Sequence, residues 1–214
     1  MFARLIYVMD PMCSWCWGFA PVAEALAKQA ADFGVPTHFV AGGLRSERTP
    51  IDAADRDRYL GYWAAVQERT GQHFDRERGL PSGMVYDTEP ACRALVTVRE
   101  VAPSQVFAFV KAVQQAFYVH GKDVSQTVEL TRIAGELGID SEAFCSRFDL
   151  DAMRETTRLD FAWARQLGIS GFPTMLAERD GQLALLTNGY QPLEALAPLL
   201  NRWLERGANL SSGR

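Results

Sequence analysis

The sequence predicts an α/β protein in which a mixed sheet flanked by helices is interrupted by a large all-helical insertion. Strand-forming runs occur near the two ends of the chain, the first of them leads through a helix to a second strand, and the long stretch between the ends has helical periodicity. We therefore expect residues 1–50 and 169–214 to form one α/β domain and residues 51–168 to form an inserted helical subdomain.

The N-terminal segment predicts a strand, a helix and a second strand. An apolar run at 4–9 ends at Asp10-Pro11, and apolar residues then recur at helical spacing to about residue 32. A second strand at 37–40 ends at Gly42-Gly43. Such a unit implies parallel pairing of the two strands with a right-handed crossover.

The middle of the chain predicts several helices. One apolar stripe consists of Tyr59, Tyr62, Trp63 and Val66, and its spacing favours a buried helical core over a cofactor site. The segment Asp87-Thr88-Glu89-Pro90 predicts a helix start, with a capping residue and an early proline. Ser125 predicts another cap, for a helix that ends at Gly138.

The C-terminal segment returns to strands. Short strands are predicted at Thr174–Ala177 and Leu183–Thr187, and Asp180-Gly181 between them is a strong hairpin signal. Leucines from 193 to 204 then predict a final helix.

The chemistry is expected at Cys13 and Cys16, which are separated only by Ser14 and Trp15 and open the first helix. Free N–H groups and the helix dipole favour an anion there, so the Cys13 thiolate should be reactive. Three residues of helix bring Cys16 to the same face, within reach of a disulfide. We predict that Cys13 is partly exposed and attacks, and that Cys16 is buried and resolves the mixed disulfide.

Two other interpretations of this pair are weaker. Zinc usually needs four ligands, but Cys92 and Cys145 stand far apart and the three histidines form no cluster, so we expect no metal. A permanent disulfide would close too small a loop to add much stability. Cys92 and Cys145 are predicted to be small buried side chains.

Composition restricts the partners. The net charge is −4, no basic tract is present, and segments such as 55–58 mix both signs, so neither nucleic acid nor a membrane is expected as a partner. The N-terminus leads directly into the first strand without a signal-peptide pattern. We therefore expect a cytoplasmic protein, in which a close cysteine pair is redox-active rather than structural.

These residues together resemble a known family. Strand, CxxC, helix and strand, with Gly171-Phe172-Pro173-Thr174 entering a late hairpin, are similar to the thioredoxin fold. The helical insertion resembles that of the DsbA-like group. The segments 10–19 and 87–94 look like the FrnE-like subgroup of predicted protein-disulfide isomerases without a signal peptide.

The resemblance implies roles for particular residues. Cys13 matches the nucleophilic cysteine and Cys16 the resolving one, and Pro173 matches a proline that is cis and lies beside them. Substrate binding is implied for the segment around that proline and for the residues between the cysteines: Ser14, Trp15, Phe172, Pro173 and Thr174. Trp15, Trp17 and Phe172 also predict an apolar rim.

The resemblance implies a thiol–disulfide oxidoreductase that reduces, isomerises or forms disulfides in a protein or small molecule. It needs a reducing or oxidising thiol partner and no cofactor besides its own disulfide, with glutathione as a candidate co-substrate. Because Ser14-Trp15 provides no positive charge, reduction or isomerisation is favoured over oxidation. The alternatives are a glutathione-dependent transferase or isomerase, of the kappa-class or hydroxychromene-carboxylate isomerase type, and a binding module that kept the fold.

Overall fold

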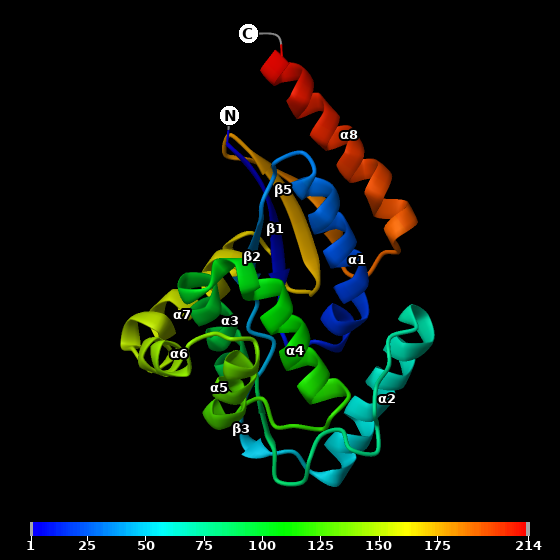
Figure 1. The fold of residues 1–214 in the computed structure, drawn as a ribbon. Helices are drawn as coiled ribbons and strands as arrows, with labels where there is room; N and C mark the ends of the chain where they lie inside the picture. Colours follow the sequence, from blue (N-terminus) through cyan, green and yellow to red (C-terminus); the bar gives the residue numbers. More distant parts are fainter. Residues whose placement is uncertain (1, 213–214) are drawn as a thin grey trace.

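A four-stranded mixed sheet forms the centre of the molecule (Figure 1). The computed structural model describes residues 2–212, with side chains to residue 207. The strands have the order β2-β1-β5-β6, in which β1 is parallel to β2 and antiparallel to β5. Their bounds are β1 (Ala3–Met9), β2 (Thr37–Ala41), β5 (Thr174–Arg179) and β6 (Gln182–Asn188).

Helices cover both faces of this sheet (Figure 1). The α-helices of the described chain are α1 (Ser14–Ala31), α2 (Ala53–Thr70), α3 (Glu89–Val101), α4 (Val106–Tyr118), α5 (Thr127–Glu136), α6 (Ser141–Phe148), α7 (Asp151–Gln166) and α8 (Leu193–Ser212). Side chains alternate along β1, so Leu5 and Tyr7 face the core formed with α1 and α8, whereas Ile6 and Val8 face a second core formed with α7. Burial on both faces explains why β1 is a continuous apolar run.

Apart from two short strands, the order of elements is the one that the sequence predicts. The sheet strands come from the segments before residue 42 and after residue 173, and α2 to α7 come from the segment between them. However, α3 and α7 both pack against β2, so the two parts share a core. Their division at residues 50 and 168 stays a prediction.

Two short strands were missing from the sequence prediction. They are β3 (Ser46–Pro50) and β4 (Val85–Asp87), which pair in a small antiparallel sheet of their own. Every residue of β3 is exposed and β4 has three residues, so neither has an apolar pattern that could reveal it.

The predicted helix start at 87–90 is confirmed, whereas the predicted cap of α5 is wrong. α3 begins at Glu89, with Thr88 at its cap position and Pro90 in its first turn, although the Thr88 hydroxyl donates to Asp10 and makes no capping bond. The cap position of α5 is Gln126 rather than Ser125, whose hydroxyl donates to Asp123. The cap position of α5 therefore lies one residue later than predicted.

The predicted hairpin is confirmed. Asp180 and Gly181 connect β5 and β6 with φ angles of 47° and 82°. Positive φ at both central residues matches the twist of the flanking strands.

The insertion also holds the outer edge of β2. Arg99 of α3 and Asp160 of α7 form a largely buried ion pair, with 2.7 Å between Nη1 and Oδ2. Arg99 also donates to the Phe39 carbonyl at 2.6 Å, and Asp160 accepts from the Ala41 N–H at 2.9 Å. The edge of β2 is therefore bound by side chains of the insertion.

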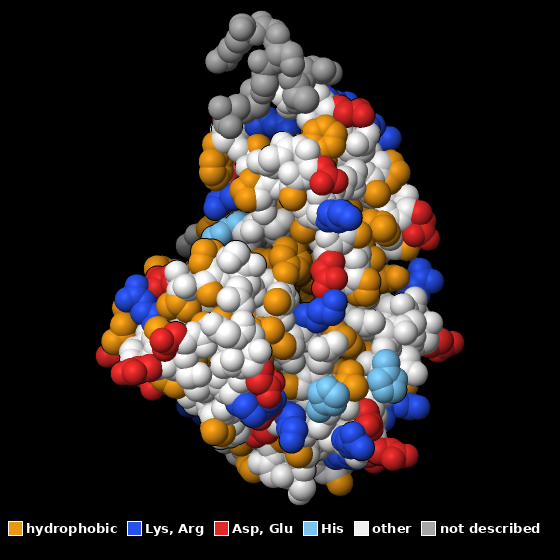
Figure 2. Space-filling model, viewed as in Figure 1, with side chains coloured by type: hydrophobic (Ala, Val, Ile, Leu, Met, Phe, Trp, Pro, Cys, Tyr) orange, Lys and Arg blue, Asp and Glu red, His pale blue; other side chains and the backbone are white. Residues whose placement is uncertain are grey.

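The surface is mixed in charge. Figure 2 shows acidic and basic side chains interspersed over the face in view, with small hydrophobic areas between them. Within residues 2–212, every helix is too short or too polar to cross a membrane.

Candidate active site

Cys13 and Cys16 lie at the N-terminal end of α1. Cys13 is the cap residue, and its carbonyl accepts hydrogen bonds from the N–H groups of Cys16 at 2.9 Å and Trp17 at 3.1 Å. The Cys13 N–H in turn donates to the Asp10 carbonyl at 3.0 Å. Both cysteines are free thiols. The turn after β1 and the first turn of α1 thus hold the two sulfurs on neighbouring positions of one short segment.

The Cys13 thiol is less accessible to solvent than the sequence predicts. Cys16 is fully buried as expected, but Cys13 is only 5% exposed rather than partly exposed. Cys13 lies against the segment 171–173, and its thiol faces the Phe172 carbonyl oxygen at 3.6 Å. The segment that carries Pro173 therefore covers Cys13, which the sequence predicts to be partly exposed.

The Phe172–Pro173 peptide bond is cis. The Phe172 ring lies so close to Gly42 that a Cβ at that position would collide with it. Pro173 and Thr174 are buried, and the Thr174 hydroxyl donates to the Gly171 carbonyl at 2.9 Å. Of these residues, Phe172 presents its side chain to the space next to Cys13.

A cavity of about 410 Å³ opens in front of Cys13. Half of its lining residues are aromatic, and Arg45 is its cationic member. The lining residues are Cys13, Ser14, Trp15, Leu44, Arg45, Tyr59, Tyr62, Trp63, Ala65, Tyr86, Gly171 and Phe172. The cavity thus brings together the predicted Cys13, Ser14, Trp15 and Phe172, but not Cys16, Pro173 or Thr174.

Part of this wall was missed in the sequence. Tyr59 and Trp63 are buried as predicted, but with the 54% exposed Tyr62 they also form one side of the cavity. Helical spacing cannot distinguish a core stripe from a cavity wall, because both are apolar faces. The prediction that Trp17 belongs to an apolar rim is wrong, because Trp17 is 5% exposed and stacks on Tyr118 inside the protein.

The surroundings of Cys16 favour its protonated form. Burial raises the pKa of the Cys16 thiol well above its usual value, and the neighbouring Cys13 thiol and Asp10 charge raise it further. A backbone hydrogen bond from the Asp10 segment lowers it in part. No cation is among these groups, so burial decides the direction of the shift.

Asp10 is the centre of a buried polar cluster beside the cysteines. One carboxylate oxygen accepts from the Met12 N–H at 2.8 Å. The other accepts from the Thr88 hydroxyl at 2.6 Å, the Leu44 N–H at 2.7 Å and the Cys92 thiol at 3.3 Å. Burial still raises the pKa of Asp10, although these hydrogen bonds lower it.

The other two cysteines have different surroundings. Cys92 is fully buried as predicted, but its thiol is a hydrogen-bond donor to Asp10 and not merely an apolar filler. Cys145 is half-buried on α6, 3.1 Å from the Thr131 hydroxyl. In the part of the chain that the structure describes, no three His, Cys, Asp or Glu side chains are grouped as metal ligands.

Comparison with known proteins places this site in a family. Residues 4–201 match the DSBA-like thioredoxin domain. A Nitrosomonas europaea protein provisionally identified as a protein disulfide isomerase is 41% identical, with a TM-score of 0.89, over 96% of this chain and 99% of that one. The cytosolic disulfide reductase DsbM from Pseudomonas aeruginosa, solved with GSH, is 25% identical, with a TM-score of 0.76, over 94% and 98% of the two chains.

More distant proteins share the fold. A 2-hydroxychromene-2-carboxylate isomerase is 17% identical, with a TM-score of 0.65, over 97% of this chain and 98% of that one. The ClpXP adapter protein SpxH from Halalkalibacterium halodurans is 19% identical over 202 residues, which are 92% of this chain. The chain spans 66% of the length of that curated relative. On the family match and the close structural relative, the chain belongs to the DSBA-like thioredoxin domain family and is a disulfide oxidoreductase/isomerase-like enzyme.

Proposed function

We propose that the protein is a cytoplasmic thiol–disulfide oxidoreductase in which Cys13 attacks and Cys16 resolves. The observation that carries this proposal is the placement of the two sulfurs: Cys13 lies at the wall of the 410 Å³ cavity, and Cys16 is fully buried one helical turn later. An incoming disulfide can therefore meet Cys13, whereas Cys16 can meet only the mixed disulfide that Cys13 forms.

Each half of the reaction exchanges one bond. The Cys13 thiolate attacks one sulfur of the substrate, forms a mixed disulfide and expels the other substrate sulfur as a thiol. Cys16 then attacks Cys13, forms the intramolecular disulfide and releases the second substrate thiol. A thiol donor must afterwards reduce the Cys13–Cys16 bond. Glutathione suits this role, and the DsbM relative was solved with GSH.

The cavity favours a small or unfolded substrate with apolar groups and an anionic group. Trp15, Tyr62 and Phe172 offer aromatic surface, and Arg45 offers a positive charge. Glutathione disulfides and cysteine-containing peptides both meet this description. We propose that Ser14 and the backbone at 172–174 bind the chain next to the reacting sulfur, as the family resemblance implies.

Reduction or isomerisation is the proposed direction. A strongly oxidising pair requires a stabilised thiolate on the attacking cysteine, and here Ser14 and Trp15 between the two cysteines bring no positive charge. We expect the Cys13–Cys16 pair to have a reduction potential below about −200 mV, measured by equilibration with glutathione or dithiothreitol buffers. A potential near the −120 mV typical of strong oxidants would contradict the proposed direction.

Replacing Cys16 with serine tests the assignment of roles. We expect C16S to accumulate a mixed disulfide with glutathione on Cys13, because the group that releases it is missing. Intact-mass spectrometry after incubation with oxidised glutathione measures this adduct, and the wild type is expected to show the intramolecular disulfide instead. Full disulfide turnover by C16S would contradict the proposal.

A glutathione-dependent isomerase is the second candidate. The observation in its favour is that one thiol faces an aromatic cavity in a fold shared with 2-hydroxychromene-2-carboxylate isomerase. Such an enzyme needs no second cysteine, so full activity of C16S would favour it over the oxidoreductase.

A further inference from the structure

Arg45 is the cationic side chain in the lining of the 410 Å³ cavity that opens at Cys13. Its side chain is 28% exposed, and its guanidinium carbon lies 4.5 Å from the centroid of the Tyr59 ring and 5.1 Å from that of Tyr86. These two rings are nearly perpendicular, with 5.2 Å between their centroids. Their faces therefore hold the cation at the wall of the cavity by cation–π attraction.

Hydrogen bonds tie the backbone around Arg45 to the turn that leads to Cys13. The Arg45 N–H donates to the Thr88 hydroxyl at 3.2 Å, and that hydroxyl donates to the Asp10 carboxylate at 2.6 Å. The Leu44 N–H donates to the same carboxylate at 2.7 Å. Since the Asp10 carbonyl also accepts from the Cys13 N–H, one residue holds both the cation and the attacking sulfur in position.

The hydrogen-bonding capacity of Arg45 is only partly used. Among the described residues, the Tyr59 hydroxyl is the acceptor for its guanidinium, at 3.2 Å from Nη1. The buried Nε has no hydrogen-bond partner there. The Glu47 carboxylate lies 3.7 Å from Nη1, which is too far for a hydrogen bond. Arg45 therefore retains donors and positive charge for another anion.

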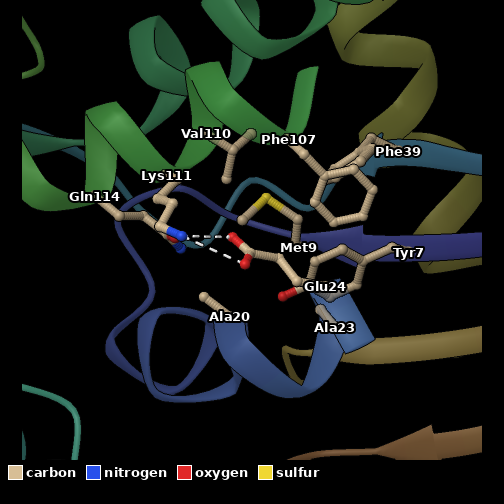
Figure 3. Close-up of a pocket in the computed structure, with 10 residues that line it drawn as sticks. All are labelled: Tyr7, Met9, Ala20, Ala23, Glu24, Phe39, Phe107, Val110, Lys111 and Gln114. Carbon is tan, nitrogen blue, oxygen red and sulfur yellow. Dashed lines mark hydrogen bonds and ion pairs between the residues drawn. The ribbon is translucent and has the colours of Figure 1, made fainter. Parts of the chain in front are cut away.

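Lys111 shows how a paired cation lies at a cavity of this protein. Between β1, β2, α1 and α4, its Nζ is 3.1 Å from one carboxylate oxygen of Glu24 and 3.3 Å from the other (Figure 3). That cavity leaves about 10 Å³ for a water-sized sphere, so it is too small for a substrate. Arg45, by contrast, has a more distant carboxylate and faces a cavity of the size that small ligands occupy.

We propose that Arg45 determines the charge specificity of the reaction by binding a carboxylate of the substrate. It selects small disulfides that carry a carboxylate close to the sulfur over neutral and cationic disulfides. The inference rests on the proposed function, in which Cys13 attacks the substrate. A cation that is partly shielded from water attracts an anion more strongly than a fully solvated one, and a guanidinium adds charge-assisted hydrogen bonds.

Glu47 is an internal competitor for this cation. It belongs to the exposed strand β3, and its side chain is 49% exposed. An exposed ion pair with a separation of 3.7 Å is weak, so a substrate carboxylate can replace Glu47. Removing the charge of Glu47 should therefore favour anionic substrates, whereas removing the charge of Arg45 should disfavour them.

Disulfides with identical two-carbon arms and different charges test this specificity. They are 3,3′-dithiodipropionate, bis(2-hydroxyethyl) disulfide and cystamine, which are anionic, neutral and cationic at neutral pH. On the C16S protein, the Cys13 thiolate bonds to one substrate sulfur, and the other sulfur leaves as a thiolate with the electrons of the broken bond. Intact-mass spectrometry after an acid quench gives the rate constant for each adduct, and peptide mapping assigns the adduct to Cys13.

Each rate constant is divided by that of the same disulfide with 2-mercaptoethanol, a neutral thiol, to remove differences in intrinsic reactivity. We expect the anionic disulfide to react fastest and the cationic one slowest. Arg45→Gln should lower the ratio of anionic to neutral rate constants about tenfold and raise the ratio of cationic to neutral ones. Arg45→Lys keeps the charge, so it should preserve the order of the disulfides with a ratio reduced about threefold.

Two further measurements follow the same charge. Glu47→Gln should raise the ratio of anionic to neutral rate constants about twofold. Higher ionic strength should narrow the differences among the disulfides, because Arg45 is partly exposed.

Arg48→Gln is the matched control, because Arg48 is an exposed arginine of β3 that does not line the cavity. It should leave the rate constants unchanged, and a change equal to that of R45Q would overturn the inference. Rate constants that do not depend on substrate charge, or equal slowing of every disulfide in R45Q, would also overturn it while leaving the proposed function intact. A protein that forms no adduct on Cys13 with any of these disulfides would overturn the proposed function itself.

Discussion

Replacing Cys13 with serine is expected to abolish disulfide exchange, reducing its rate at least about 10³-fold. A serine hydroxyl is almost fully protonated at neutral pH, and it cannot form the mixed disulfide on which both halves of the reaction depend. Cys16 cannot take over, because it is fully buried and does not line the large cavity. Reduction of oxidised glutathione, or of a disulfide-containing peptide, coupled to a thiol donor measures the loss.

C145S is the matched control for this variant. Cys145 is half-buried on α6 and is absent from the lining of the large cavity, so its loss removes one thiol without changing the site. C145S should retain wild-type rates. If C13S retained more than a few per cent of the activity, the reaction would have to proceed without the proposed nucleophile.

Replacing Asp10 with alanine is expected to destabilise the protein by about 3 kcal/mol or more. The change leaves the Met12 and Leu44 N–H groups, the Thr88 hydroxyl and the Cys92 thiol without their acceptor. Each buried donor left without a partner costs about 1–3 kcal/mol, and water entering the space recovers part of the total. The midpoint of thermal unfolding should fall by about 6–12 °C in a chain of this size.

Asp57→Ala serves as the control, because Asp57 is an exposed carboxylate on α2. It should change the midpoint by little, as exposed substitutions generally do. Equal effects of D10A and D57A would show that the Asp10 cluster adds nothing to stability.

The Asp10→Asn variant separates the contribution of the Asp10 charge to stability from that of its hydrogen-bond acceptor. Burial raises the pKa of Asp10, so its ionised form is disfavoured in the folded protein. Protonation of Asp10 therefore stabilises the folded protein. This contribution is complete below the pKa of Asp10 in the unfolded chain and is lost as pH rises through its pKa in the folded protein. Relative to D10N, the wild type should gain stability as pH falls from neutral toward that range, and urea unfolding at several pH values measures this gain.

The sequence predicted the parts of the fold that have a regular apolar pattern or a characteristic turn. The run at 4–9 and the hairpin at Asp180-Gly181 were found because strands need apolar continuity or alternation and tight turns need positive φ. The strand β3 was not found, because it has no buried face. The helix start at 87–90 was found from its early proline, whereas the cap of α5 was placed one residue too early, at Ser125 instead of Gln126.

The site was predicted less completely than the fold. The cysteine pair and the Phe172-Pro173 segment are local patterns that meet in the structure. Arg45 and Tyr62 reach the cavity through loop and helix placements that depend on tertiary packing.

The ion pair of Arg99 and Asp160 has a consequence for self-association. An unprotected outer strand can template pairing with another molecule, which leads to aggregation. At β2 this route is blocked, because the pair occupies the Phe39 carbonyl and the Ala41 N–H. At the other end of the sheet, β6 pairs with β5 alone among the described strands and carries the exposed Leu183 and Leu185. The helical insertion thus protects one edge of the sheet from polymerisation. A shorter insertion that lacked Arg99 and Asp160 would leave both edge strands open to pairing with another molecule.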